Sequence, residues 1–303
     1  MAITAAMVKE LREKTGAGMM DCKNALAEAE GNMERAVDIL REKGLSKAAK
    51  KADRVAAEGL VSLIIAEDGK KASLVEVNSE TDFVAKNEEF KAFVADAAKL
   101  VVENLPADMD AFMALEMEGT TVAEVIKTKV AKIGENLNIR RFSAMEATAG
   151  RVSGYVHGAG KIGVLVELET ASASDEIDVL GKDIAMQVAA MNPKYVSTDD
   201  VDQDYVAHER EVLMAQALNE GKPQNIVEKM VEGRLQKELK EVCLLEQVFV
   251  KNPDFTIKSL IADIAKKVGA EIKVVRVERF EVGEGIEKKE ENFAEEVAKQ
   301  LGN

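Results

Sequence analysis

Apolar residues recur at two different spacings along the chain, and the change in spacing marks a change in predicted structure. Between residues 1 and 44 they recur every three to four positions in three short runs, which predicts three short helices. Thr4, Asp21 and Asn32 are the expected N-caps of these helices, because their side-chain oxygens can accept hydrogen bonds from the first turn. Gly44 is the expected end of the third helix.

A basic segment, 45–55, is predicted to be a solvated linker, and strand-like alternation begins after it. This alternating pattern is present twice: residues 59–76 align without a gap on residues 150–167, with eight of eighteen positions identical. Each copy has two apolar runs joined by a glycine-containing turn, as in a β-hairpin. A second pair of matching segments, 133–139 and 268–274, each predicts the order helix, glycine, strand.

The duplication predicts two related lobes, 56–147 and 148–283, each a small antiparallel sheet backed by helices. The second lobe carries an insertion, 202–239, with two helical runs separated by a Gly-Lys-Pro turn. Its apolar stripes and charged faces favour a projecting antiparallel coiled coil. The chain is then expected to return through a strand at 244–250.

The last segment, 284–303, is predicted to be a charged C-terminal helix. Phe293, Val297 and Leu301 recur every four residues and form one apolar stripe. Together with the N-terminal bundle and the two lobes, this segment completes a predicted α+β protein.

Composition narrows the class of protein. With 47% hydrophobic residues among 303, the chain can bury a large core and is not a disordered polymer. The formal net charge of −14 opposes binding to nucleic acid, whose phosphates attract Lys and Arg. No stretch has the apolar length of a membrane span, and Met1–Thr4 leads into a charged run instead of a secretory signal. We therefore expect a cytoplasmic protein that binds neither nucleic acid nor membrane.

Residues suited to catalysis or metal binding are few and scattered. The chain has two histidines, His157 and His208, and two cysteines, Cys22 and Cys243. The cysteines could form a disulfide, but two buried thiols in a reducing compartment are the simpler interpretation. Neither pair forms part of a recognisable metal-ligand spacing, so no metal site is predicted.

One segment, 158–163, matches the glycine pattern of dinucleotide-binding loops. That pattern needs a helix N-terminus after it to receive the pyrophosphate. Here the alternating run Val164–Leu168 predicts a strand instead. We therefore interpret the glycines as turn residues of a hairpin.

A polar corner follows the second predicted strand of the first lobe. There Asp82 and Phe83 stand side by side, ahead of a helix-like run from Phe90. Phe83 could project outward and wedge into another molecule, or it could cap the protein's own core, as an aromatic after a strand usually does. The second lobe has Ala173 and Ser174 at the same offset, which favours a role for the pair outside the shared fold. From the residues alone, both interpretations stay open.

Several motifs resemble those of the bacterial elongation factor Ts family. Two of them are long, Ser79–Asn87 and Leu11–Lys23, and shorter ones lie at 132–136, 157–158 and 280–285. They occur in the family's order and are spread over nearly the whole chain, which makes the resemblance specific.

The resemblance implies a function. Members of this family are guanine-nucleotide exchange factors: they bind elongation factor Tu and promote GDP release by disturbing its Mg²⁺ and phosphate site, so that GTP can bind. The chain is then not expected to be an enzyme, to need a cofactor or to bind nucleotide directly. Residues 1–44 are then similar to a ubiquitin-associated (UBA-like) domain that holds the partner. The implied partner-binding residues are Thr81, Asp82, Phe83 and Val84 at the wedge, and His157, Gly158, Phe293 and Val297 elsewhere.

Two other functional classes stay open from the residues. A nucleotide-binding enzyme would use the glycines at 158–163, and a helical adaptor would use 1–44 and the coiled coil without speeding nucleotide release. For His157 a plain turn position is the alternative to a partner contact, and the stripe in 284–303 packs by default on its own chain. A homodimer and a 2:2 complex with elongation factor Tu are left open as well.

Overall fold

The chain forms two compact units in the computed structural model, which describes residues 3–221 and 223–287, without the side chains of 45–49 and 224–225. Of the described residues, the first unit takes those within Met1–Val61, Val75–Phe142 and Glu281–Asn303, and the second takes Ser62–Leu74 and Ser143–Phe280. The boundaries between these units fall inside strands and do not follow the order of the chain. They therefore do not test the domain ranges expected from the sequence, which stay predictions. The α+β class is confirmed.

The N-terminal part of the first unit is a bundle of three helices, α1 (Ala5–Thr15), α2 (Met19–Glu28) and α3 (Met33–Ala49). Two expected caps are confirmed. The Met7 amide donates to Thr4 Oγ1 at 3.3 Å, and the Arg35 amide donates to Asn32 Oδ1 at 3.0 Å. The bundle has its own apolar core, which consists of Leu11, Cys22, Ala25, Leu26, Ala29, Ala36 and Ile39.

Two expected helix boundaries in this bundle are wrong. Helix α2 starts at Met19 after the N-cap Gly18, so Asp21 lies inside the first turn. Helix α3 continues through Gly44 and ends at Ala49. A glycine inside a helix costs only about 1 kcal/mol relative to alanine. The Lys and Ala residues that follow Gly44 favour helix, so one glycine does not end it.

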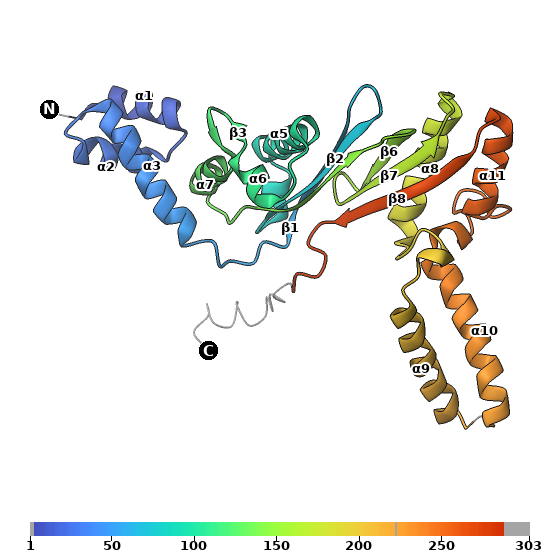
Figure 1. Ribbon diagram of the computed structural model, residues 1–303. Helices are drawn as coiled ribbons and strands as arrows, with labels where there is room; N and C mark the ends of the chain where they lie inside the picture. Colours follow the sequence, from blue (N-terminus) through green and yellow to red (C-terminus); the bar gives the residue numbers. More distant parts are fainter. Residues whose placement is uncertain (1–2, 222, 288–303) are drawn as a thin grey trace. The chain divides into compact units, whose positions relative to one another are not determined.

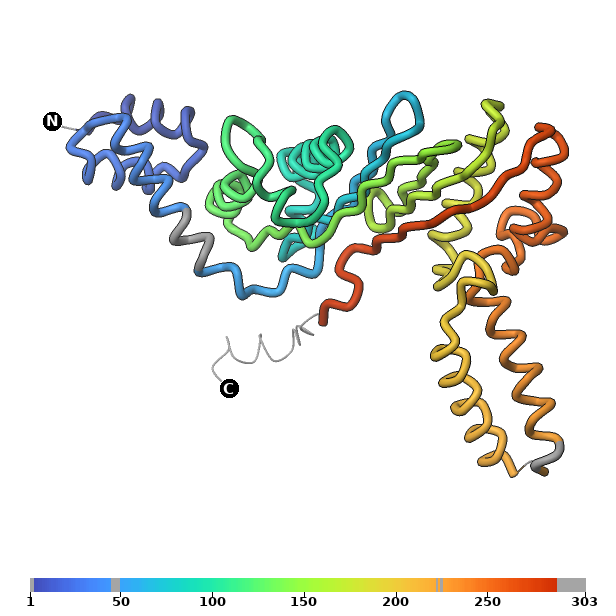
Figure 2. Tube along the Cα trace, viewed as in Figure 1, coloured from blue at the N-terminus to red at the C-terminus, as the bar shows by residue number. Residues whose placement is uncertain are grey.

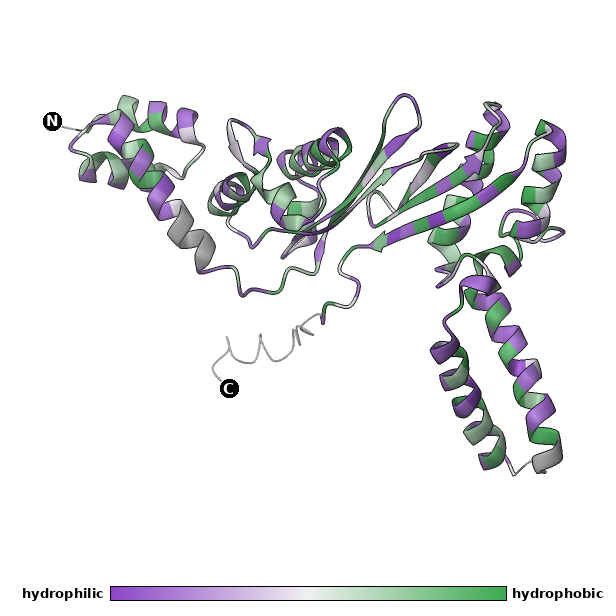
Figure 3. Cartoon of the chain, viewed as in Figure 1, coloured by the Kyte–Doolittle hydropathy of each residue, from purple (hydrophilic) through white to green (hydrophobic). Residues whose placement is uncertain are grey.

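Each lobe contains a three-stranded sheet. In the first lobe the strand order is β1-β2-β5, formed by Glu58–Ile65, Lys71–Ser79 and Asn138–Glu146. In the second lobe the order is β6-β7-β8, formed by Arg151–His157, Ile162–Thr170 and Ile272–Glu281. Strands β6 and β7 are antiparallel. Buried and exposed residues alternate over the first four residues of β8, as expected of a strand with one buried face, and Figure 3 shows both hydrophobic and hydrophilic residues along it.

The helices of the two lobes correspond in length and capping. Helices α5 (Glu88–Asn104) and α8 (Asp175–Met191) both have 17 residues and both end at a residue in the left-handed conformation. Helices α7 (Val122–Ile133) and α11 (Ile257–Val268) both have 12 residues, a threonine N-cap and a glycine C-cap. The first lobe also contains the short elements α4 (Asp82–Ala85), α6 (Met109–Ala114), β3 (Glu116–Met117) and β4 (Thr120–Thr121).

The two lobes also share a glycine that allows a close approach of backbone to backbone. A Cβ atom on Gly59 would lie 2.1 Å from the Val77 carbonyl oxygen, and one on Gly150 would lie 1.9 Å from the Leu168 carbonyl oxygen. Both glycines have positive φ, at 137° and 106°. Any side chain at either position would clash with backbone, which explains why both copies keep glycine there.

The expected helical hairpin is confirmed as α9 (Gln203–Asn219) and α10 (Gln224–Val242), which run side by side (Figures 1 and 2). Its apolar contacts include a small cluster around Ala217, Val227 and Val231. At the base of the hairpin the Tyr205 hydroxyl donates to Glu238 at 2.7 Å. Coiled-coil packing of the two helices stays a prediction.

The strand expected at 244–250 is wrong. Residues Leu244–Glu246 form a 3₁₀ turn, and Val248 makes only an isolated bridge to Thr256. The Val250 amide donates instead to the Gln187 side chain at 2.9 Å. The buried Gln187 side chain thus accepts the hydrogen bond that the backbone of a neighbouring strand would otherwise accept. A C-terminal helix is expected at 284–303; residues 284–287 are not helical, and the rest of that segment, with its stripe of Phe293, Val297 and Leu301, lies outside the described residues.

Candidate protein-interaction site at a single helical turn

The polar corner after β2 folds into α4, a single helical turn of four residues. Thr81 is its N-cap: the backbone is extended there, and Oγ1 accepts from the Val84 amide at 3.4 Å. Asn87 then caps α5, accepting from the Glu89 amide at 2.8 Å. The short turn is therefore bounded by a cap residue on each side, which fixes its backbone.

This turn presents Phe83 to solvent. The Phe83 residue is 80% exposed, the highest value among the large hydrophobic residues that the structure describes. Ala85 in the same turn is only 4% exposed, and Val84 is half-buried, so these two residues hold the turn against the unit. The alternative interpretation, in which Phe83 caps its own core, is wrong, and Phe90 and Phe93 of α5 fill that core instead.

A charged pair lies beside the exposed ring. The Lys86 ammonium donates to Asp82 Oδ2 at 2.6 Å, and it lies 6.0 Å from the centroid of the Phe83 ring. Both charged side chains are largely open to solvent, so the pair adds little to the stability of the fold. An exposed aromatic with a polar rim is the usual anatomy of a protein-interaction site.

Comparison of the two lobes shows that α4 is an insertion. The strand ends Ser79 and Thr170 are 91 positions apart, whereas the helix caps Asn87 and Ser174 are 87 positions apart. The first lobe therefore has four extra residues between strand and helix, as many as α4 contains. The duplicated fold forms without this turn in the second lobe, so the turn is not needed to build a lobe.

The other sequence-predicted site residues lie elsewhere. His157 and Gly158 belong to the second unit, where His157 ends β6 and both are exposed. The Tyr155 hydroxyl lies 3.0 Å from His157 Nδ1, which orients the imidazole. Phe293 and Val297 lie outside the described residues. Within the first unit, the four residues of the wedge, Thr81, Asp82, Phe83 and Val84, lie in one short segment.

The glycine segment 158–163 joins β6 to β7. Gly158, Ala159 and Gly160 all have positive φ, which makes them a tight turn between two antiparallel strands. No helix N-terminus follows this segment, because β7 runs on from Ile162. The turn therefore lacks the feature with which a dinucleotide-binding loop receives a pyrophosphate.

A second exposed apolar site, not predicted from the sequence, lies in the N-terminal bundle. Met19 and Met20 open helix α2 and are 61% and 64% exposed. Neighbouring residues of a helix point in different directions, so a helix with one buried face does not bury both residues of an adjacent pair equally. Two adjacent methionines directly after a glycine were therefore the sequence signal for an exposed apolar site. Flexible methionine side chains are common in surfaces that bind other proteins.

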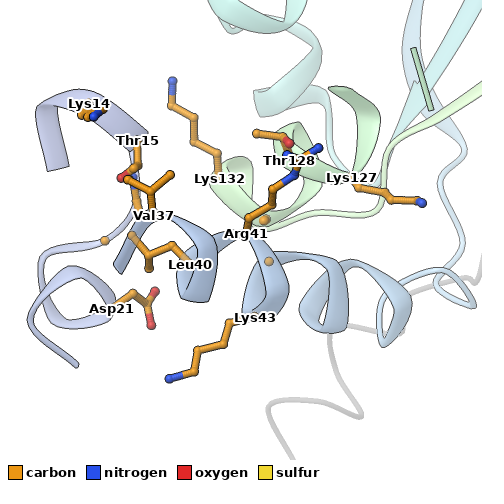
Figure 4. Close-up of a pocket in the computed structure, with 14 residues that line it drawn as sticks. Lys14, Thr15, Asp21, Val37, Leu40, Arg41, Lys43, Lys127, Thr128 and Lys132 are labelled. Carbon is orange, nitrogen blue, oxygen red and sulfur yellow. The ribbon is translucent and has the colours of Figure 1, made fainter. Parts of the chain in front are cut away.

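A cavity of about 310 Å³ lies within the first unit, between the bundle and α7 (Figure 4). Val37 and Leu40 contribute apolar surface from α3, and Thr128 and Ala131 face them from α7. Five basic side chains also line it, Lys14, Arg41, Lys43, Lys127 and Lys132. Three of these lysines already pair with carboxylates: Lys43 with Glu28, Lys127 with Glu124 and Lys132 with Glu89. The cavity is thus a packing gap between α3 and α7 with a basic rim.

Neither a membrane-spanning helix nor a metal-ligand cluster is present among the described residues. None of the described helices has the length and apolar character needed to cross a bilayer. Within the same residues, His, Cys, Asp and Glu side chains nowhere gather in a group of three or more that could hold a metal ion.

Fold and site together define the class: an α+β protein with a duplicated lobe, in which one copy carries an inserted turn with an exposed aromatic. A family model described as Elongation factor TS matches residues 80–284. The chain is 69% identical over 300 residues to elongation factor Ts of Clostridioides difficile (strain 630), covering 99% of both chains. It is 56% identical over 302 residues to the protein of the same name from Clostridium novyi (strain NT), again covering 99% of both. The chain belongs to the elongation factor Ts family.

Proposed function

We propose that the chain is a guanine-nucleotide exchange factor that acts on elongation factor Tu during translation elongation. Membership of the elongation factor Ts family supports the partner. The observation that carries the mechanism is the position of Phe83, 80% exposed on a turn that only the first lobe contains. A large exposed aromatic on an inserted, capped turn serves contact with another molecule better than it serves the fold.

Exchange follows from a difference in affinity. A ligand shifts an equilibrium only by as much as its affinities for the two states differ. The factor speeds GDP release if it binds nucleotide-free elongation factor Tu more tightly than the GDP-bound form. In this mechanism Phe83 enters an apolar gap beside the partner's Mg²⁺ and phosphate site, with Asp82 at its rim. The resulting displacement weakens Mg²⁺ coordination and phosphate contacts, so GDP leaves and GTP binds.

The structure of the turn suits a wedge. Val84 and Ala85 are packed and Thr81 caps the turn, so the backbone that carries Phe83 is already ordered before binding. Ordering a loop on binding opposes association, and a preorganised turn avoids that cost. The binding energy of the ring is then available to move the partner instead of ordering the factor.

Other parts of the chain contribute affinity in this proposal. The exposed Met19 and Met20 give the N-terminal bundle an apolar docking patch, and His157 with Gly158 offers a contact from the second unit. Phe293 and Val297 would add a C-terminal contact. The factor acts in the cytoplasm without a cofactor and forms no covalent intermediate, and it does not itself bind nucleotide. A homodimer and a 2:2 complex with the partner are both compatible with these contacts.

Removal of residues 1–49 is expected to weaken partner binding about tenfold or more while both sheets stay folded. The bundle has its own apolar core, and its main contact with the rest of the first unit, between α3 and α7, involves neither sheet. The expected kinetic signature is a higher half-saturating concentration with an unchanged maximal GDP-release rate. Circular dichroism and a titrated release assay would measure both.

In the intact chain, the double substitution Met19→Ala and Met20→Ala is the matched control for this truncation. It removes the exposed apolar patch without removing any helix. The same rise in half-saturating concentration is expected. Collapse of the remaining fold in the truncated chain would instead show that the bundle is part of the core.

The proposed function is tested by the affinity of the protein for elongation factor Tu in two states, nucleotide-free and GDP-bound. We expect tighter binding of the nucleotide-free form, and added GDP should weaken the complex by the same factor, because the linkage is reciprocal. Equal affinity for both states would overturn the proposal and indicate a helical adaptor. Direct binding of GDP or NAD by the isolated chain would indicate a nucleotide-binding enzyme.

A further inference from the structure

We infer that Glu135 is a positioning residue that holds the turn carrying Phe83, acting through Thr81 without touching the partner. The inference rests on the proposed function, in which Phe83 is the wedge. Glu135 lies directly after α7 and its C-cap Gly134, far from the turn in sequence. The structure brings it against the first residue of the inserted segment.

The Glu135 carboxylate accepts two hydrogen bonds from one residue. The Thr81 amide donates to Glu135 Oε2 at 3.0 Å, and the Thr81 hydroxyl donates to Oε1 at 2.6 Å. The same hydroxyl accepts from the Val84 amide at 3.4 Å. Its one proton is used on Glu135, so its lone pairs face the helical turn. The carboxylate therefore fixes both the backbone and the rotamer of the residue that caps α4.

A second carboxylate, that of Glu80, accepts a hydrogen bond from the loop that contains Glu135. Glu80 Oε1 accepts from the Asn136 amide at 2.6 Å. The Asn136 side chain in turn donates to the Arg54 carbonyl oxygen at 2.8 Å and to the Ala52 carbonyl oxygen at 3.2 Å. Neighbouring residues of two loops thus each supply a carboxylate to the other loop. We call Glu80, Thr81, Glu135 and Asn136 the clasp.

The second lobe shows that the shared fold does not need the clasp. Counting from the C-cap glycines Gly134 and Gly269, Ala270 stands where the first lobe has Glu135. Counting from the matched strands, Ala171 stands in place of Glu80. Neither alanine can accept a side-chain hydrogen bond.

Another pair of charged residues was kept in both lobes. In the first, Arg141 Nε donates to Glu76 at 2.6 Å, and at the corresponding positions of the second, Arg276 Nε donates to Glu167 at 3.0 Å. Side chains that build the lobe are therefore present twice, whereas the clasp is present only where the extra turn is. This internal comparison assigns the clasp to the turn and its exposed ring, not to the sheet.

Local motion of the turn is the first readout, and it does not depend on exchange. The chain contains no tryptophan, so Phe83→Trp introduces a single fluorescent reporter at the site. In the Phe83→Trp protein with Glu135 in place, time-resolved anisotropy should show slow rotation of the Trp side chain. When Glu135→Ala is added to this protein, a fast local component should appear. Glu135→Gln, which keeps one acceptor oxygen, should fall between the two. Unchanged rotation in Glu135→Ala would overturn the inference.

Exchange kinetics are the second readout, measured with Phe83 in place. Glu135→Ala should lower the maximal GDP-release rate about tenfold, because two charge-assisted hydrogen bonds are lost, and leave the half-saturating concentration within about twofold. Thr81→Val combined with Glu135→Ala should add little to the single change, since both act on one contact. Glu103→Ala is the matched control, an exposed carboxylate of α5, and should leave both parameters unchanged.

The two readouts separate failure of this inference from failure of the proposed function. If the unaltered protein does not speed GDP release, the proposed function fails, yet anisotropy still reports whether Glu135 holds the turn. Normal exchange by Glu135→Ala, with Phe83→Ala inactive, would overturn the positioning role alone. Fully additive losses in the double variant would also contradict it.

Discussion

Replacing Phe83 with alanine should lower the rate of GDP release from elongation factor Tu about thirtyfold or more while leaving thermal stability nearly unchanged. An aromatic anchor at an interface is worth about 2 kcal/mol or more when truncated, which corresponds to that factor. Truncation of a buried phenylalanine would instead cost the protein about 3–5 kcal/mol of its own stability. Phe83 is 80% exposed, so the loss should appear in exchange and not in the fold.

Two variants calibrate this result. Val179→Ala truncates another exposed apolar side chain, 57% exposed on α8, and should leave exchange unchanged. Asp82→Ala should be milder than Phe83→Ala, because an exposed carboxylate paired with Lys86 exchanges protein contacts for water. A large fall in melting temperature for Phe83→Ala, with normal exchange by the folded fraction, would contradict the wedge.

The largest effect on stability is expected from Glu76→Gln, at about 3 kcal/mol near neutral pH. Glu76 lies on the central strand β2, and its side chain is fully buried. Four donors within 3.2 Å converge on its carboxylate, from Asn78, Arg140, Arg141 and the Gly283 amide. In Glu76→Gln the side-chain NH₂ group would face hydrogen-bond donors, and the positive charges of the two arginines would lose the negative charge that balances them. Both changes are costly in a buried site.

The pH dependence of this effect has a definite sign. Burial alone raises the pKa of Glu76, but hydrogen bonds from Gly283, Asn78 and Arg141, with the charge of Arg141, outweigh it and hold the pKa below its ordinary value. A carboxyl with a depressed pKa stabilises the fold above its unfolded pKa and loses that contribution as pH falls. The stability difference between the parent and Glu76→Gln should therefore be full at neutral pH and shrink below about pH 4.

Urea unfolding at several pH values would measure this difference. Glu167→Gln is the matched control from the second lobe, where one arginine bond at 3.0 Å holds the corresponding carboxylate. Its smaller network should give a smaller loss. A Glu76→Gln protein as stable as the parent at neutral pH would show that the four contacts do not stabilise the charged form.

The duplicated framework could be predicted from sequence because it depends on local patterns. Alternating apolar residues, hairpin glycines, and the Thr256 cap with Gly269 at the end of α11 are all signals within one element, and the structure confirms them. Gly59 and Gly150 matched because the same backbone approach constrains both copies. Patterns of this kind identify elements well.

What the sequence did not decide depends on tertiary contacts. Segment 244–250 has the apolar pattern of a strand, but its backbone amides are satisfied by other parts of the fold: the Leu244 amide donates to the Tyr195 carbonyl oxygen, and the Val250 amide donates to the Gln187 side chain. Whether Phe83 is exposed or buried could not be predicted from the neighbouring residues in sequence. It depends on the orientation of the four-residue turn, in which Ala85 is the residue that faces the core. Glu135 lies within the motif at 132–136, but its contact could not be predicted from that motif, because its partner Thr81 is brought to it only by the fold.

Release of a fluorescent GDP analogue from elongation factor Tu, chased with excess unlabelled GDP, tests the central claim most directly. The release rate should rise with the concentration of this protein and then saturate. Substitution of Phe83 by alanine should lower the saturated rate about thirtyfold without preventing the two proteins from forming a complex. A release rate that stays at its unassisted value while the complex forms would contradict the claim that this chain is an exchange factor.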